Sequence, residues 1–154
     1  MPSDTNKPTT SLPAARILLL SEDQEELETV RQHLELDGAE AVRVEPADSW
    51  QEVLDAAESR EADLLLLDPD CYEDDLAGIL DLLGEGKPLA ETPVVLLADN
   101  GQMESCRELV ESGALDFIRR PVDRADIRSR VGSQLRLKNL YDHVREQKKE
   151  LEEM

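Results

Sequence analysis

Acidic side chains that come directly after apolar runs are the feature of this sequence that could do chemistry. The acids that follow the runs at residues 17–20, 64–67 and 94–98 are Glu22, Asp23, Asp68, Asp70 and Asp99. Carboxylates gathered at one place repel each other unless a positive charge lies among them. If these acids meet, we expect either a divalent cation such as Mg²⁺ or a basic side chain, for which Arg120 is the candidate. The alternative is that they face solvent as loop acids of an acidic protein, although Asp68 directly follows the most apolar run.

The acids can meet only if the apolar runs are neighbouring strands of one sheet. Short, continuously apolar runs are typical of strands buried on both faces, and weaker strands are expected at residues 41–44 and 116–119. Apolar residues at helical spacing predict helices at about residues 27–36, 50–57, 76–83 and 103–112, and one long helix from about residue 124 to the end. The second helix is expected to be capped by Asp48 or Ser49. Strands that alternate with helices predict an α/β fold, a doubly wound five-stranded parallel sheet in three layers, whose ligand site lies at the carboxyl ends of the strands.

Charge and composition argue against several classes of function. The net charge of −19 would repel nucleic acid and anionic lipid, and one Trp, one Phe and two Tyr are too few for a base-stacking surface. No stretch approaches the roughly 18 apolar residues of a membrane span, and the first 15 residues lack the pattern of a secretory signal. Cys71 and Cys106 form neither a disulfide framework nor a metal-ligand pattern. We therefore expect a cytoplasmic protein without nucleic-acid or membrane partners.

The chain is expected to have three parts. Residues 1–14 are rich in Pro, Ser and Thr and predict a disordered lead, residues 15–136 form the folded domain, and residues 137–154 continue the last helix. Charge also changes along the chain: residues 1–118 contain 7 basic and 29 acidic side chains, whereas residues 119–154 contain 10 basic and 7 acidic ones.

The last part carries a heptad pattern. Its a and d positions are Leu137, Leu140, Val144, Gln147, Leu151 and Met154. Such a stripe is typical of parallel two-stranded coiled coils, so we expect a homodimer held by residues 137–154. The stripe is short, and a solvated helical tail is the alternative.

Four segments occur in the order and spacing of a known family. They read ILLLSED, ADLLLLD, TPVVLLAD and SGALDFIRRP, and Asp68, Ala98 and Arg120 are separated by 30 and 22 residues. From about residue 16 to residue 137 the chain thereby resembles the receiver domain of bacterial response regulators, the CheY-like domain of two-component systems. The resemblance implies the flavodoxin/CheY-like form of the doubly wound fold.

The resemblance also implies a phosphorelay role. Asp68 matches the phosphoacceptor, which would receive a phosphoryl group from a histidine kinase or a phosphotransfer protein. Arg120 stands where the family has lysine, and a cis bond to Pro121 is expected by the same analogy. Phe117 falls at the aromatic position that reorients when such domains switch. The state would then pass through the C-terminal helix to an output domain beyond residue 154.

The metal site and the switch depart from the family pattern. The resemblance implies Mg²⁺ bound by Glu22, Asp68 and Asp70, with Asp23 as a further candidate ligand. Ser21 replaces the first of the family's two metal-binding acids, so Mg²⁺ binding is expected to be weak. Ala98 replaces the Thr or Ser whose hydroxyl binds the phosphoryl oxygen, a contact worth roughly 1.5–3 kcal/mol.

Three functions therefore remain open at this point. The first is a phosphorylatable receiver, which is not itself an enzyme. The second is a pseudo-receiver, a protein-interaction or dimerisation module that keeps the fold without aspartyl phosphate. The third is an aspartate-nucleophile phosphatase, which requires a second acid close after the nucleophile, and only Asp70 favours it.

Overall fold

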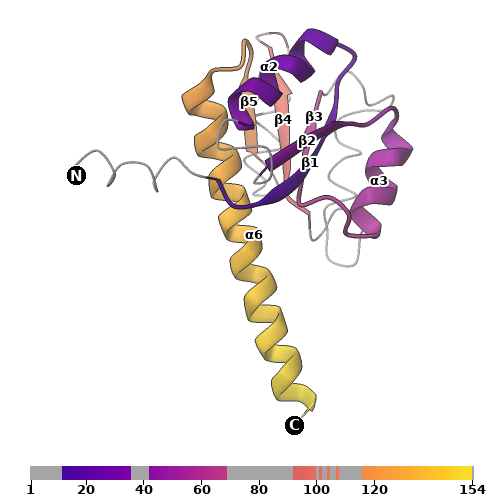
Figure 1. The fold of residues 1–154 in the computed structure, drawn as a ribbon, viewed down its shortest axis with the longest axis vertical. Coiled ribbons are helices and arrows are strands. Elements are labelled where there is room, and N and C mark those ends of the chain that lie inside the picture. The colour runs from indigo at the N-terminus through magenta and orange to yellow at the C-terminus, as the bar shows by residue number, and fades with distance from the viewer. Residues whose placement is uncertain are drawn as a thin grey trace, which may run out of the picture.

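The computed structural model describes residues 12–35, 42–68, 92–99, 101, 104, 107 and 116–153 (Figure 1). In these residues the strands are β1 (Ala15–Leu20), β2 (Val42–Pro46), β3 (Leu64–Leu67), β4 (Val94–Ala98) and β5 (Asp116–Arg119). The helices are α2 (Gln24–Leu34), α3 (Trp50–Glu58) and α6 (Arg124–Glu153). The expected helices at residues 76–83 and 103–112, apart from Glu104 and Arg107, lie outside the described residues, as do both cysteines and Asp70.

The sheet is parallel throughout and has the strand order β2-β1-β3-β4-β5, which confirms the predicted doubly wound α/β fold. This order is that of flavodoxin-like sheets. The strands expected at residues 64–67, 94–98 and 116–119 have the predicted bounds. β2 extends two residues further than its apolar run, because Glu45 and Pro46 pair with β1 through the backbone and β2 is an edge strand, where proline is tolerated.

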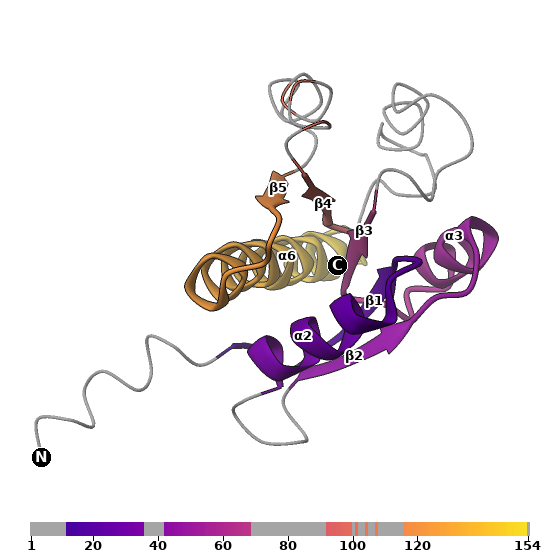
Figure 2. The ribbon, with the colours of Figure 1, turned by 90° about the horizontal axis from the view of Figure 1, so that it is seen from above.

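Alternate side chains of the strands enter two apolar layers. On β1, Ile17 and Leu19 face α2 and α6, whereas Leu18 and Leu20 face α3. Figure 2 shows α2 and α6 on one side of the sheet and α3 on the other. All side chains of β3 and β4 are buried, as expected for strands covered on both faces.

Polar residues fix where the two shorter helices begin. Asp23 caps α2, because its Oδ1 accepts a hydrogen bond from the backbone N–H of Glu25 at 2.9 Å. Ser49, and not Asp48, caps α3, and its Oγ accepts from the backbone N–H of Glu52 at 3.2 Å. The Glu52 carboxylate accepts in turn from the backbone N–H of Asp48 at 2.8 Å.

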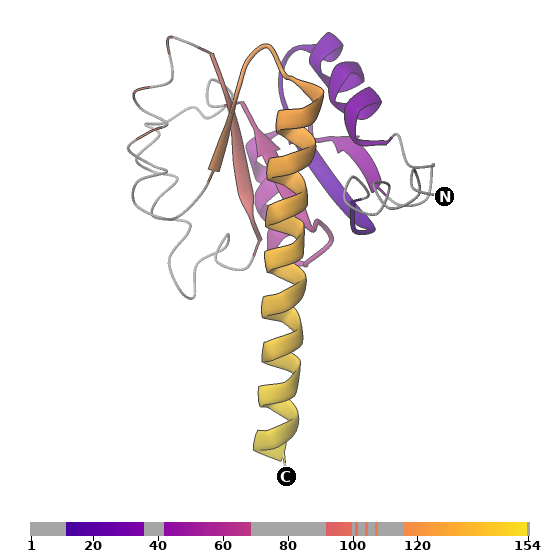
Figure 3. The ribbon, with the colours of Figure 1, turned by 90° about the vertical axis from the view of Figure 1, so that its left-hand side faces the viewer.

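α6 leaves the domain after covering one face of the sheet. Its buried residues are Ile127, Val131, Gly132 and Leu135. After Leu135 the helix continues away from the body of the domain (Figure 3). At Gly132 an added Cβ would lie 3.1 Å from Cδ2 of Leu12, which is itself buried. Leu12, which precedes the boundary predicted at residue 15, thus packs in the same apolar cluster as Ile127 and Val131 of α6. The boundary itself stays a prediction.

Candidate functional site

Asp68 lies at the carboxyl end of β3, next to the end of β1. Its backbone N–H donates to the carbonyl oxygen of Leu20 at 2.9 Å, which continues the pairing of the two strands by one residue. Only 13% of its side chain is exposed. The most apolar strand thus delivers one carboxylate to the edge of the sheet where ligands bind in this fold.

Arg120 brings a positive charge to the same edge from the end of β5. Its backbone N–H donates to the carbonyl oxygen of Ala98 at 2.8 Å, and the expected cis bond to Pro121 is present. The guanidinium Nη2 lies 3.1 Å from Oδ2 of Asp68. The acid and the base that are 52 residues apart in the sequence therefore meet, as the strand-end pattern predicted.

Glu26 is the site residue that sequence reasoning missed. Its two carboxylate oxygens accept hydrogen bonds from Nε and Nη2 of Arg120 at 2.6 and 2.7 Å, a bidentate arrangement. Oε1 also accepts from the hydroxyl of Ser21 at 2.9 Å. Glu26 lies four residues before the buried Val30, on the inward face of α2. A charged residue on that face, one turn after a strand end, was the signal that could have found it.

The two carboxylates hold Arg120 in its charged form. Burial lowers the pKa of the guanidinium, but the hydrogen bonds and charge of Glu26, and then those of Asp68, outweigh burial and raise the pKa above its ordinary value. Arg120 and Glu26 expose only 18% and 9% of their side chains, so water screens this pair less than a surface ion pair. One guanidinium, that of Arg120, therefore pairs with two carboxylates, those of Glu26 and Asp68.

The other predicted site residues differ in their exposure and in the groups that they contact. Glu22 is exposed, and Asp23 uses one carboxylate oxygen to cap α2. Ala98 is fully buried, in the apolar cluster on the α3 side of the sheet, and Phe117 packs against that cluster. The carboxylate of Asp99 accepts from the backbone N–H of Gly101 at 3.1 Å. Asp70 lies outside the described residues.

A family model for the response regulator receiver domain matches residues 17–132. The chain belongs to this family. The match covers β1 from Ile17 onward and all of β2 to β5, and it includes Ser21, Glu26, Asp68 and Arg120. The resemblance read from the four sequence segments is thereby confirmed.

Solved structures give the same fold. A response regulator receiver domain protein from Clostridium thermocellum is 22% identical, with a TM-score of 0.66 over 82% of this chain and 98% of that chain. A response regulator receiver modulated diguanylate cyclase from Pelobacter carbinolicus is 24% identical, with a TM-score of 0.60 over 84% and 98%. NtrX from Brucella abortus in complex with ADP is 24% identical, with a TM-score of 0.70 over 88% of this chain but 29% of that chain. A comparison with curated proteins finds no match.

Receiver domains generally bind Mg²⁺ at the phosphorylation site. Among the described residues, no three His, Cys, Asp or Glu side chains gather as ligands for a metal. Glu26 directs both oxygens to Arg120, and Asp68 directs one oxygen to the same guanidinium. These donors do not fit a divalent cation as they are arranged here. The assignment of Glu22, Asp68, Asp70 and Asp23 as ligands stays a prediction, since Asp70 lies outside the described residues.

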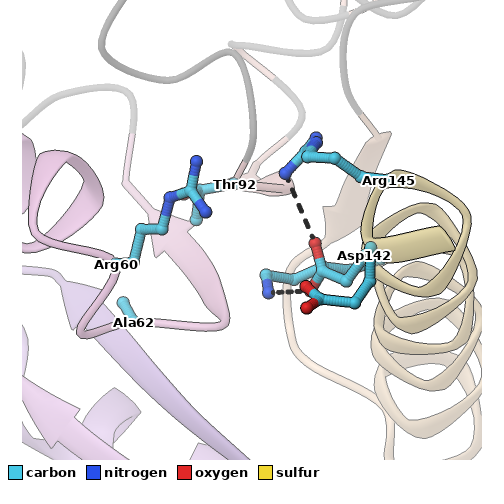
Figure 4. Close-up of a pocket in the computed structure, with 7 residues that line it drawn as sticks. Arg60, Ala62, Thr92, Asp142 and Arg145 are labelled. Atoms are coloured by element: carbon cyan, nitrogen blue, oxygen red, sulfur yellow. Dashed lines mark hydrogen bonds and ion pairs between the residues drawn. The ribbon is translucent and has the colours of Figure 1, made fainter. Parts of the chain in front are cut away.

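A cavity of about 230 Å³ lies at the other edge of the sheet, beside the amino ends of β3 and β4 (Figure 4). It is lined by Arg60, Ala62, Thr92, Lys138, Asp142, Arg145 and Glu146. Nζ of Lys138 lies 2.7 Å from Oδ2 of Asp142 and 3.6 Å from Oδ1 of Asp63, which precedes β3. The Arg145 guanidinium lies 3.7 Å from Oδ1 of Asp142. Two of these ion pairs therefore lie within α6, and the pair of Lys138 with Asp63 connects α6 to the rest of the domain. The cavity lies away from Asp68.

Within the described part of the chain, no helix combines the length and the apolar character that a membrane-spanning segment requires.

Proposed function

We propose that this receiver accepts a phosphoryl group on Asp68 from a histidine kinase or a phosphotransfer protein and relays its state through α6 to an output domain. One observation carries the proposal: the carboxylate of Asp68, at the end of a buried strand, lies 3.1 Å from the guanidinium of Arg120. In this role the chain is a cytoplasmic signalling domain and the substrate of its kinase, not an enzyme.

The arrangement suits phosphoryl transfer from a phosphohistidine. One carboxylate oxygen of Asp68 attacks phosphorus, a P–O bond forms as the P–N bond breaks, and the imidazole leaves with its electron pair and takes up a proton. Arg120 is positioned to neutralise the phosphoryl oxygens, which carry the charge in the transition state. The same positive charge repels a divalent cation, which is the reason to expect weak Mg²⁺ binding at this site.

Arg120 also connects the phosphoacceptor to α6. It contacts Asp68 through its side chain, and α6 begins four residues later at Arg124. The first turns of α6 are fastened to the domain, because Arg130 pairs with Asp116 of β5 at 2.9 Å. A phosphoryl group that draws Arg120 to a new position therefore acts directly on the segment that leads into this helix.

The far part of α6 is suited to a second copy of the chain. Its exposed apolar side chains are Leu137, Leu140, Tyr141, Val144 and Leu151, with exposed fractions between 46% and 71%. Each large apolar side chain that stays in water lacks roughly 1.5–3 kcal/mol of stabilisation that its burial would provide. Tyr141 widens the predicted a/d stripe on the same side of the helix. We propose that two copies pair in parallel along residues 137–154 and carry the signal to output domains. One solved structure with the same fold is named as a receiver modulated diguanylate cyclase, a receiver joined to such an output activity.

The proposal is tested by treating the protein with a small phosphodonor and measuring its intact mass. Wild type should gain one phosphoryl group, and Asp68→Asn should gain none. Asp99→Asn is the matched control, because it removes an acid after the neighbouring strand, and it should be modified like wild type. An equal gain in mass by Asp68→Asn would show that another residue accepts the phosphoryl group.

A second function, a pseudo-receiver controlled by partner contacts, is favoured by the bidentate pair of Glu26 and Arg120. The guanidinium of Arg120 already binds a carboxylate in the absence of a phosphoryl group. Ala98 supplies no hydroxyl for a phosphoryl oxygen. Failure of wild type to gain mass, together with failure to bind a beryllium fluoride mimic, would select this function.

A further inference from the structure

The acids around Asp68 need a positive charge, and the structure shows which group supplies it. Carboxylates close together in a poorly solvated site are stable only beside a cation. Here Glu26 and Asp68, with side chains 9% and 13% exposed, share the guanidinium of Arg120. The charge that a divalent ion would supply is thus already provided in part by a side chain.

Glu26 determines where that charge lies. Its carboxylate binds Nε and Nη2 of Arg120 together, which fixes the plane of the guanidinium, and the Ser21 hydroxyl fixes Glu26 in turn at 2.9 Å. Nη2 is shared, because it also lies 3.1 Å from Asp68. Ser21 is the residue that replaces a metal-binding acid of the family. Its hydroxyl donates to the carboxylate that holds the arginine, so the departure from the family pattern and the new ion pair form one unit.

We propose that the Arg120 guanidinium, positioned by Glu26, takes the place of the divalent cation in this receiver, so that the site needs no Mg²⁺. Arginine suits this role because its planar fork binds two carboxylates at once, whereas a lysine ammonium is a single compact charge. The replacement of the ion by Arg120 does not depend on the proposed function of Asp68. Its consequence does rest on that function, because it states that phosphoryl acceptance proceeds without Mg²⁺.

The test is a Mg²⁺ titration of the full chain followed by the backbone amide shifts of Ser21, Glu26 and Asp68. Wild type should show no saturable change up to about 10 mM Mg²⁺. Arg120→Gln leaves two carboxylates without their cation and should bind Mg²⁺ at least ~10-fold more tightly than wild type. Arg119→Gln is the matched control, since it removes the same charge from the exposed neighbouring residue, and it should behave like wild type.

A second variant covers the case in which Arg120→Gln does not fold. Arg120→Lys keeps the charge but cannot hold both oxygens of Glu26 together with Asp68, so it should also bind Mg²⁺ more tightly than wild type. Saturation of wild type below about 10 mM, or equal binding by wild type and every folded Arg120 variant, would overturn the inference.

Failure of the inference and failure of the proposed function can be distinguished with a phosphodonor in the presence of either Mg²⁺ or a chelator. Modification of Asp68 in both conditions supports both proposals. Modification that requires Mg²⁺ overturns the substitution of Arg120 for the ion but leaves Asp68 as the acceptor. No modification in either condition overturns the acceptor role, and the Mg²⁺ titration then decides the inference by itself.

Discussion

At the scale of single residues, Glu26 is the side chain on which the geometry of the site most depends. Removal of one partner from a poorly exposed, bidentate ion pair leaves the other charge without compensation. Glu26→Gln should therefore lower the free energy of unfolding by about 2–4 kcal/mol, measured by urea denaturation. Glu25→Gln, in the exposed first turn of the same helix, should change it by less than about 0.5 kcal/mol. Equal losses in the two variants would mean that the ion pair does not stabilise the fold.

Ala98 offers a second test at this scale. Ala98→Thr and Ala98→Val add groups of the same size to a fully buried position, so they should share a packing cost of about 1–3 kcal/mol. Only threonine adds a hydroxyl that can bind a phosphoryl oxygen, a contact worth roughly 1.5–3 kcal/mol. Ala98→Thr should therefore bind beryllium fluoride at least ~10-fold more tightly than Ala98→Val, measured by fluorine NMR. Equal affinities would show that a hydroxyl at this position does not reach the ligand.

The sequence predicted which strand ends meet but not how α2 is rotated over them. Asp68 and Arg120 could be placed together because parallel strands bring their carboxyl ends to one edge whatever their side chains are. Glu26 could not be placed, because a difference of one residue in the start of α2 would have turned it by about 100° around the helix. That start is fixed by the Asp23 cap, a contact among polar residues that hydrophobic periodicity does not detect.

At the scale of the elements, the strand bounds were predictable where a fully buried apolar run marks them and less so in β2. β3 and β4 are continuous apolar runs and have the predicted bounds, whereas β2 includes Glu45 and Pro46, which pair through the backbone alone. The helices followed the same principle. The apolar residues of α6 are packed on the sheet as far as Leu135, and beyond Leu135 its large apolar residues are exposed.

The change at Leu135 leads to a prediction about assembly. A chain that ends at Leu135 keeps every buried residue of α6 and loses the exposed stripe, so it should be a folded monomer. The full chain should be a dimer, because pairing buries apolar side chains worth roughly 1.5–3 kcal/mol each. Sedimentation equilibrium of the two proteins, with circular dichroism to confirm the fold, makes the comparison. Dimerisation of the shortened chain as tight as that of the full chain would assign the interface to the domain.

At the scale of the whole molecule, Asp68 and the exposed part of α6 lie at opposite ends of the domain. Asp68 and Arg120 are at the carboxyl ends of the strands, whereas α6 leaves the domain beside their amino ends, where Lys138 pairs with Asp63 (Figure 3). The body of the helix between these ends is packed on the sheet and tied to α2, because Arg128 donates to the carbonyl oxygen of His33 at 2.8 Å. Coupling between the two ends therefore has a continuous physical route through α6.

Whether the state of Asp68 reaches the far end of α6 is tested most directly by the dimer dissociation constant with and without beryllium fluoride, measured by sedimentation equilibrium. Coupling between distinct sites is reciprocal and typically changes affinity 5- to 150-fold, so occupancy of Asp68 should change this constant by at least about 5-fold in wild type. Asp68→Asn, which lacks the acceptor, should keep one constant in both conditions. An unchanged constant in wild type that fluorine NMR shows to be fully occupied would contradict the relay.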